Sequence, residues 1–242
     1  MKIPVIYEDE YLVVFDKPVG VVVNKSKSSG DFTLQSYLIE HYNAPFEELS
    51  SSLDRSEEDI EFDEFKLRSG IVHRLDKQTS GVIVVAKDEA SFINLQKQFR
   101  DREVQKKYIA LVLGKVLEQK IEIDAPIMRN PDYRYKMIMS PEGKDAFTSL
   151  ENIGNFEISG LHFTMFNIFP RTGRTHQIRV HLVGIGHPVA GDDIYMTKKQ
   201  YEQVFPLFNR LMLHANTLIL NHPHTGDRLE LVAPTPQEFN LH

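Results

Sequence analysis

The apolar residues of this chain are gathered in short runs, and the longest of these, such as Gly81–Ala86, hold only about six residues. A helix that crosses a membrane needs roughly 20 consecutive apolar residues, so the sequence predicts no such helix. Runs this short are typical of strands separated by turns. We expect strands over residues 11–15, 21–23, 81–86, 108–113, 146–152, 156–169, 211–220 and 228–232, with turns at 17–20, 141–143, 170–174 and 223–226.

Helical patterns are fewer than strand patterns. Residues 33–40 have a short helical pattern. Asp88 can cap a second helix, in which Phe92, Leu95 and Phe99 share one face. Runs of strands with only a few helices predict an α+β fold, built on a mixed and mostly antiparallel sheet flanked by helices.

The segment Thr175–Gly186 fits two structures. Ile178, Val180 and Leu182 alternate as in a strand, whereas Ile178, Leu182 and Ile185 suit a helix that is capped by the Thr at its start. We favour the helix. The whole chain of 242 residues is long enough for one large domain, and we expect a single domain over 1–242.

The charge of the chain is unevenly distributed. The formal net charge is −6, but residues 40–66 alone hold ten acidic and two basic residues, which leaves +2 for the rest. We expect an acidic insertion at about 44–66 that forms a solvated loop. Binding of a polyanion would then depend on local basic patches.

The chain has no cysteine, which excludes disulfides, thiolate metal sites and cysteine nucleophiles. The N-terminus, Met1–Pro4, has no secretory or Arg-rich targeting pattern. We therefore expect a cytoplasmic protein.

Residues 69–81 carry the densest group of chemically active side chains. His73, Arg74 and Asp76 lie just ahead of a Thr-Ser-Gly turn and a buried strand, where loops present functional groups. Asp76 could act as a nucleophile, since carboxylates attack sugar anomeric carbons in glycoside chemistry. The alternative is that Asp76 only caps the turn.

Residues 171–181 carry three arginines within nine residues, Arg171, Arg174 and Arg179. The arginine fork is always charged and suits a buried carboxylate or a phosphate. The alternative is a cationic surface edge that pairs with the acidic segment.

Three histidines, His176, His181 and His187, raise the question of a metal. Their spacing matches no recognised ligand pattern, so we expect no metal site. The sequence also lacks a Walker-type loop and the dinucleotide-binding glycine fingerprint, and we expect no cofactor.

Tyr108 directly follows Lys106 and Lys107. An aromatic ring beside basic residues can stack on a base while the lysines hold phosphates. Lys97 and Arg100 could hold further phosphates from the preceding helix. The alternatives are half-buried packing for the Tyr and a solubilising helix face for the bases.

Taken together, the motifs of this chain resemble those of the RluA-type pseudouridine synthase family. The matches follow the family's order from about residue 6 to residue 233. They are Asp16-Lys17-Pro18-x-Gly20, His73-Arg74-Leu75-Asp76-x-x-Thr79-Ser80-Gly81, Lys107-x-x-x-Leu111-Val112-x-Gly114, Gly173-Arg174-Thr175-His176-Gln177-Ile178-Arg179-x-His181-Leu182, Gly186-His187-Pro188-x-x-Gly191-Asp192 and Leu211-x-Leu213-His214-Ala215.

Two departures from the family's pattern concern the target. Longer members carry a small N-terminal RNA-binding domain, which we do not expect here. Many members have His where this chain has Asn24. The resemblance therefore leaves open which RNA and which uridine would be modified.

The resemblance implies an enzyme that isomerises uridine to pseudouridine in ribosomal or transfer RNA without cofactor or metal. We expect the RNA to be a stem-loop. The sequence leaves the oligomeric state open, and a monomer is the default expectation. It makes Asp76 the essential carboxylate, which attacks the sugar carbon or assists its deprotonation. Arg179 would be its cationic partner and Tyr108 would stack on the target base. The residues that would bind the substrate are Arg74, Thr79, Lys97, Arg100, Lys106, Lys107 and Leu213.

The resemblance also implies how Arg74 and Leu213 would act. The target nucleotide must flip out of its stack, and Arg74 would fill the vacated space. Leu213 would form an apolar wall of the uracil pocket. We expect His73 to support the loop through a hydrogen bond. The alternatives to this enzyme are a non-catalytic RNA-binding module on the same fold and a metal-dependent hydrolase built on the histidines.

Overall fold

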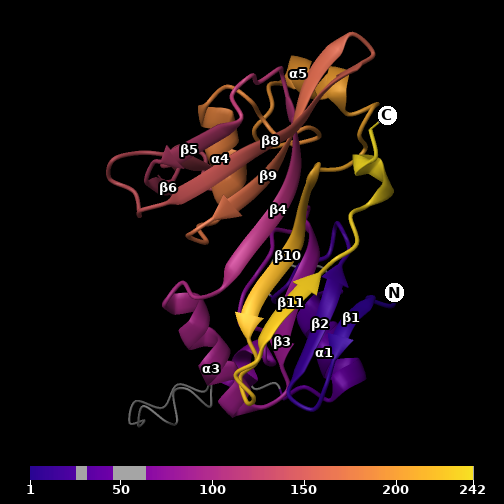
Figure 1. Cartoon of the computed structure of the whole chain (residues 1–242), viewed down its shortest axis with the longest axis vertical. Helices are drawn as coiled ribbons and strands as arrows, with labels where there is room; N and C mark the ends of the chain where they lie inside the picture. Colours follow the sequence, from indigo (N-terminus) through magenta and orange to yellow (C-terminus); the bar gives the residue numbers. More distant parts are fainter. Residues whose placement is uncertain (26–31, 46–63, 242) are drawn as a thin grey trace. The chain divides into compact units, whose positions relative to one another are not determined.

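The computed structural model describes residues 1–25, 32–45 and 64–241 (Figure 1). The chain forms two compact units. The first comprises Met1–Val104 and Leu218–Ala233, and the second comprises Gln105–Thr217 and Pro234–His242. Most of the predicted acidic insertion lies outside the described residues. The prediction of one catalytic domain over 1–242 stays a prediction.

The sheet of the first unit begins with three antiparallel strands. β1 (Val5–Glu8) pairs with β2 (Leu12–Lys17), which pairs with β3 (Ser80–Ala86). Every residue of β3 is buried, because α3 packs against this strand (Figure 1) and no face of it is open to solvent. The strands predicted over 11–15 and 81–86 are confirmed.

Two helices of the first unit begin at capping residues. α1 (Leu34–Tyr42) begins at Thr33, whose hydroxyl accepts a hydrogen bond from the Ser36 N–H. α3 (Glu89–Arg100) begins at Asp88, as predicted, and its apolar face is buried in the unit. A short helical stretch covers residues 64–68.

The strand predicted over residues 21–23 is wrong. Val22 forms only an isolated bridge with Thr33, although its neighbours are buried. The carbonyls of Val22 and Val23 accept hydrogen bonds from the N–H groups of Leu34 and Gln35, at 2.9 and 3.0 Å. These N–H groups lie in the first turn of α1 and have no partner within the helix, so residues 22 and 23 serve the helix rather than a sheet.

The sheet of the second unit has the order β4-β9-β8-β5. These strands are β4 (Gln105–Leu113), β5 (Lys120–Asp124), β8 (Phe147–Ile158) and β9 (Leu161–Pro170), and the neighbours pair antiparallel. A separate hairpin consists of β6 (Ile127–Arg129) and β7 (Met137–Met139). Thus strands run through most of this unit.

One strand is divided between the two units. β10 (Leu213–Asn221) begins in the second unit and ends in the first, where β11 (Arg228–Val232) pairs with it. The hairpin predicted at 223–226 is confirmed. Since both units combine antiparallel strands with helices, the predicted α+β fold is confirmed.

The ambiguous segment forms a helix, α4 (Gln177–Gly184), as we favoured. Its N-cap is His176 in the left-handed conformation (φ 55°), so the predicted cap by Thr175 is wrong. Residues 177–182 are all buried. A helix without an exposed face shows no helical periodicity of apolar residues, which explains the ambiguity. The remaining helices are α5 (Lys198–Val204) and a 3₁₀ turn at Gln237–Phe239.

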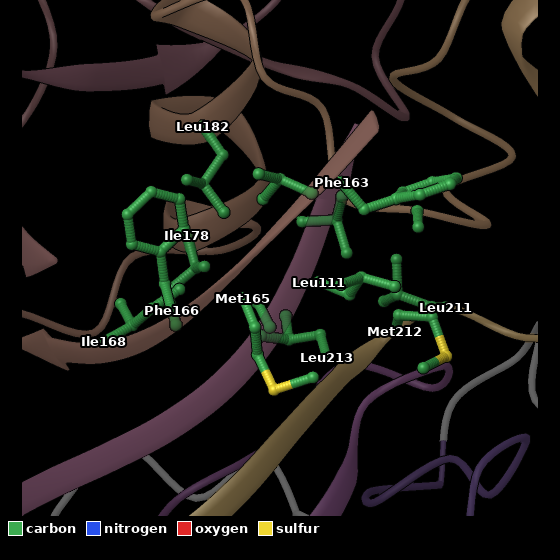
Figure 2. Close-up of a cluster of buried hydrophobic side chains, with 14 of the residues drawn as sticks. Leu111, Phe163, Met165, Phe166, Ile168, Ile178, Leu182, Leu211, Met212 and Leu213 are labelled. Carbon is green, nitrogen blue, oxygen red and sulfur yellow. The ribbon is translucent and has the colours of Figure 1, made fainter. Parts of the chain in front are cut away.

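The core of the second unit packs α4 against the sheet. Figure 2 shows Ile178 and Leu182 of α4 beside Phe166 and Ile168 of β9. The same cluster includes Leu213. Among the residues that the structure describes, no helix is both long and apolar enough to cross a membrane.

Candidate active site

The segment that leads to Asp76 is fixed against β3. Gly70 has a φ of +78°, and a Cβ at this position would lie 2.0 Å from the Ala86 carbonyl oxygen. The Ala86 N–H donates to the Gly70 carbonyl at 2.9 Å, and Ile71 bridges to Val85. Only a glycine fits this close approach of two backbones.

His73 supports the same segment, as predicted. Its Nε2 accepts a hydrogen bond of 3.0 Å from the Val84 N–H. Its ring stacks on Phe99 of α3 with centroids 4.7 Å apart. His73 therefore joins the segment to both β3 and α3.

Asp76 is half-buried and lies on a tight turn. The Asp76 carbonyl accepts the Thr79 N–H at 3.1 Å, and the Lys77 carbonyl accepts the Gly20 N–H at 2.8 Å. One main-chain hydrogen bond thus closes the turn that carries the Asp76 carboxylate, and a second joins this turn to Gly20.

Lys17 gives this turn a further support. Its side chain is 0% exposed, and its Nζ donates to the carbonyls of Pro18, Val21 and Lys77 at 3.0, 2.9 and 3.3 Å. A buried ammonium is stable only where such acceptors replace water. The sequence analysis missed Lys17 as a support of the Asp76 turn. Its position in the Asp16-Lys17-Pro18 motif was the signal.

The other candidates of the first unit differ in exposure. Arg74 is exposed, whereas Thr79 is buried at the entrance to β3. Lys97 and Arg100 are exposed on the last turn of α3, and Arg100 lies 3.6 Å from the Asp101 carboxylate. Arg74, Lys97 and Arg100 can therefore reach a ligand in solvent.

Arg179 of α4 is buried in a bidentate ion pair. Its Nε and Nη2 each lie 2.7 Å from a different oxygen of Asp192, and the two residues are 2% and 0% exposed. Asp192 Oδ1 also accepts the N–H groups of Ile194 and Tyr195, each at 3.0 Å. Arg179 is thus not part of a cationic surface edge, which corrects that alternative for this residue.

The turn before α4 depends on Gln177, which sequence analysis did not single out. Its Oε1 accepts the Thr172 hydroxyl at 2.7 Å and the Arg174 N–H at 3.0 Å. Its Nε2 donates to the Phe147 carbonyl and to the Thr148 hydroxyl, both at 3.0 Å. This buried amide fixes the turn that carries Arg174, and no local pattern distinguishes it from an exposed glutamine.

The three histidines considered for a metal site make separate contacts. Their ring nitrogens contact the Tyr195 hydroxyl (His176, 2.9 Å), the Ala125 carbonyl (His181, 2.9 Å) and the Leu113 carbonyl (His187, 3.1 Å). Burial lowers the pKa of His181 below its usual value. Within residues 1–25, 32–45 and 64–241, no three His, Asp or Glu side chains are grouped so that they could hold a metal ion.

The remaining candidates of the second unit lie on β4 and β10. Tyr108 is half-buried and sits opposite Ile168 in the sheet. Lys106 and Lys107 are also half-buried, and Lys106 Nζ donates to the Thr172 carbonyl at 3.3 Å. Leu213 is buried, and Figure 2 shows it beside Met165.

The predicted site residues thus form two groups, one in each unit. The first group is Arg74, Asp76, Thr79, Lys97 and Arg100, and the second is Lys106, Lys107, Tyr108, Arg179 and Leu213. That the Asp76 carboxylate and the Arg179 guanidinium serve one site stays a prediction.

The β6–β7 hairpin carries an exposed group of aromatic and basic residues that the sequence analysis missed. Tyr133 and Tyr135 are 57% and 61% exposed, and the Lys136 ammonium lies 5.7 Å from the centre of the Tyr135 ring. Arg129 donates to the Arg134 carbonyl. The alternation of rings and cations over residues 129–136 was the available signal, and such a surface suits nucleic acid.

Comparison with known proteins gives a family. The family model described as RNA pseudouridylate synthase matches residues 11–183. The ribosomal large subunit pseudouridine synthase D of Nitrosomonas europaea is 39% identical over 97% of this chain and 62% of its own length. The protein of the same name from Pseudomonas aeruginosa is 35% identical over 99% of this chain and 70% of its own. This chain therefore spans less than two thirds of the Nitrosomonas relative.

Two solved human structures are similar in fold. RNA Pseudouridylate Synthase Domain Containing 1 has a TM-score of 0.75 and 26% identity, over 97% of this chain and 84% of its own. RNA Pseudouridylate Synthase Domain Containing 4 has a TM-score of 0.68 and 26% identity, over 98% and 90%. Since the family model covers more than half of the sequence and these relatives match nearly all of it, the chain belongs to the RNA pseudouridylate synthase family.

Proposed function

We propose that this protein is an RNA pseudouridine synthase that uses Asp76 as its essential carboxylate. One observation carries the proposal. Asp76 lies half-exposed on a turn that the buried Lys17 and main-chain hydrogen bonds hold in place, within the segment 11–183 that matches the family. A fixed, solvent-accessible carboxylate is what a reaction at a sugar carbon needs.

The reaction is an isomerisation, so its atoms balance without a co-reactant. The bond between the ribose C1′ and the uracil N1 breaks, the uracil turns, and a bond forms between C1′ and C5. The proton on C5 is lost and N1 gains one. Asp76 either attacks the sugar carbon or assists its deprotonation, and the proposal holds for both.

Two residues of the second unit complete the catalytic set. Arg179 would supply the positive charge that pairs with the Asp76 carboxylate and orients it. Tyr108 would stack on the target base and help to remove the C5 proton. Leu213 would form an apolar wall of the uracil pocket, and its place in a packed core would make that wall rigid.

Binding of RNA requires the target nucleotide to leave its stack. Unstacking costs a few kcal/mol, and the exposed Arg74 would offset part of this by filling the space left behind. Phosphates would be contacted by Lys97, Arg100, Lys106 and Lys107. Thr79 would help to bind the substrate at the turn that carries Asp76. The exposed tyrosines and bases of the β6–β7 hairpin would extend this surface.

We further propose that the substrate is a stem-loop of large-subunit ribosomal RNA and that the enzyme acts as a cytoplasmic monomer. The names of the Nitrosomonas and Pseudomonas relatives support the choice of this RNA over transfer RNA.

Pseudouridine mapping tests this proposal. Total RNA from cells with and without the gene is compared, and a third strain carries the gene restored on a plasmid. We expect one or a few pseudouridines of large-subunit ribosomal RNA to disappear and to return on restoration. Loss from transfer RNA alone would contradict the choice of substrate, and an unchanged map would contradict the enzymatic function and favour a non-catalytic RNA-binding module.

A further inference from the structure

The Arg179 guanidinium is bound by Asp192 along the edge formed by Nε and Nη2. Its Nε and Nη2 pair with the two oxygens of Asp192, both at 2.7 Å, and both side chains are almost completely buried. Two parallel hydrogen bonds fix the plane of the fork as well as its distance. The edge that includes Nη1 then points in a direction set by Asp192.

Asp192 is itself fixed by the main chain around it. Its Oδ1 accepts the N–H groups of Ile194 and Tyr195. Gly191, directly before it, has a φ of +74°, and a Cβ there would lie 1.9 Å from the Arg210 carbonyl oxygen. The backbone directly before Asp192 therefore packs against that of Arg210 with no room for a side chain at residue 191.

Tyr195 contacts Arg179 from another side. The centre of its ring lies 5.1 Å from the guanidinium carbon. Its hydroxyl contacts His176 Nδ1 at 2.9 Å and accepts the Met137 N–H at 2.8 Å. His176 has the left-handed conformation directly before α4, the helix that carries Arg179. A strained residue of this kind persists only where its surroundings hold it.

A contribution to the stability of the fold does not by itself explain the buried Arg179–Asp192 ion pair. A buried ion pair often stabilises a fold no better than an apolar pair of the same volume, because both charges lose their water. A guanidinium that acts on a charge in a reaction must instead be oriented before the substrate arrives. The bidentate pair, the fixed loop and the ring together provide that orientation.

We propose that Asp192 is a positioning residue of the enzyme: it fixes the orientation of the Arg179 guanidinium, the cation of the proposed catalytic set. The inference rests on the proposed function, in which Arg179 is the partner of Asp76. It adds a residue that touches neither RNA nor the reacting atoms and acts only through Arg179.

A double-mutant cycle tests whether Asp192 acts through Arg179. The variants are Asp192→Asn, Arg179→Lys and the double variant, each assayed for pseudouridine formation in single turnover at saturating RNA. We expect Asp192→Asn to slow the reaction about 100-fold, since a misplacement of about 1 Å has effects of this size, with the Kd for RNA within about threefold of wild type. In the Arg179→Lys background the same change should slow it by less than about threefold.

Thr164→Val is the matched control. Thr164 is 0% exposed in the same unit, and its hydroxyl accepts the Val116 N–H and lies within donating distance of the Gly114 carbonyl and of Asn155 Oδ1. Its loss should lower stability and leave the single-turnover rate within about threefold of wild type.

Three results decide the question. A wild-type rate for Asp192→Asn, or an equal slowing in both backgrounds, would overturn the positioning role. If Asp192→Asn does not fold, the same cycle is made with Asp192→Glu, which keeps the negative charge but displaces the carboxylate from the Arg179 guanidinium, and the same criteria apply. A wild-type protein without any isomerase activity would refute the proposed function instead, so the two failures are distinguishable.

Discussion

The side-chain ammonium of Lys17 lies 3.3 Å from the main-chain oxygen of Lys77, the residue directly after Asp76. The same ammonium donates to the carbonyls of Pro18 and Val21. One buried cation therefore joins the turn after β2 to the turn that carries the proposed essential carboxylate. Loss of this cation should move Asp76 as well as weaken the fold.

We expect Lys17→Met to lower the free energy of unfolding by about 2–4 kcal/mol, because one buried and two part-buried carbonyls lose a charged donor. At a temperature where the variant is folded, the single-turnover rate should fall by a factor on the order of 10–100. Urea unfolding and the rate assay measure the two effects. Lys77→Met is the control for stability, since this side chain is exposed and its carbonyl is kept. A Lys17→Met variant as stable and active as wild type would refute the support role.

Arg179→Ala should remove activity and destabilise the second unit. It leaves the buried Asp192 carboxylate without its partner, which costs about 3–5 kcal/mol. Asp192→Ala introduced together with Arg179→Ala should recover part of the stability in urea unfolding but none of the activity. Near-normal single-turnover rates in Arg179→Ala would contradict the proposed role of Arg179 as the cationic partner of Asp76.

Arg74→Ala should affect structured RNA more than flexible RNA. The exposed Arg74 side chain is proposed to fill the space that the flipped nucleotide leaves, and unstacking costs most in an ordered stem-loop. We expect a loss of about tenfold or more in the rate on the folded stem-loop relative to a linear RNA of the same sequence. Lys97→Ala serves as a comparison, because a phosphate contact should affect both RNAs alike. Equal losses on both RNAs with Arg74→Ala would count against the flipping role.

Asp9 should make the first unit sensitive to acid. Its carboxylate accepts hydrogen bonds from the Tyr7 hydroxyl, from the Tyr11 and Leu12 N–H groups and from His222 Nε2. Burial alone would raise the pKa of Asp9, but these hydrogen bonds outweigh it and lower the pKa to about 2.

A carboxyl whose pKa is lowered on folding stabilises the protein above its unfolded pKa of about 3.9. This contribution, about 2 kcal/mol, is lost as the pH falls from about 4 to about 2. In urea unfolding over this range, Asp9→Asn should be less stable than wild type at pH 5 and should lose less stability on acidification. Parallel stability curves for the two proteins would refute this prediction.

The sequence predicted the elements whose signals are local. Alternating or continuous short apolar runs located β3, and the capping residue Asp88 located α3. The failure at residues 21–23 has a tertiary cause, because Val22 and Val23 give their carbonyls to the first turn of α1. No pattern within three residues can indicate that partner.

The site was predictable in its residue types but not in its supports. Asp76 and Arg179 stand in motifs with many charged neighbours, so the sequence directs attention to them. Asp192 pairs with Arg179, which lies 13 residues earlier in the sequence. Lys17 differs from most lysines because its side chain is completely buried. Both are fixed by main-chain groups that any residue could supply, and such partners become visible only in three dimensions.

The most direct test of the central claim is the release of tritium from RNA labelled at C5 of uridine, measured in single turnover for wild type and Asp76→Asn. The account predicts tritium release by the wild-type protein and none above background by Asp76→Asn, while both bind the RNA with similar Kd. Release by Asp76→Asn within about tenfold of the wild-type rate would contradict the assignment of Asp76 as the essential carboxylate.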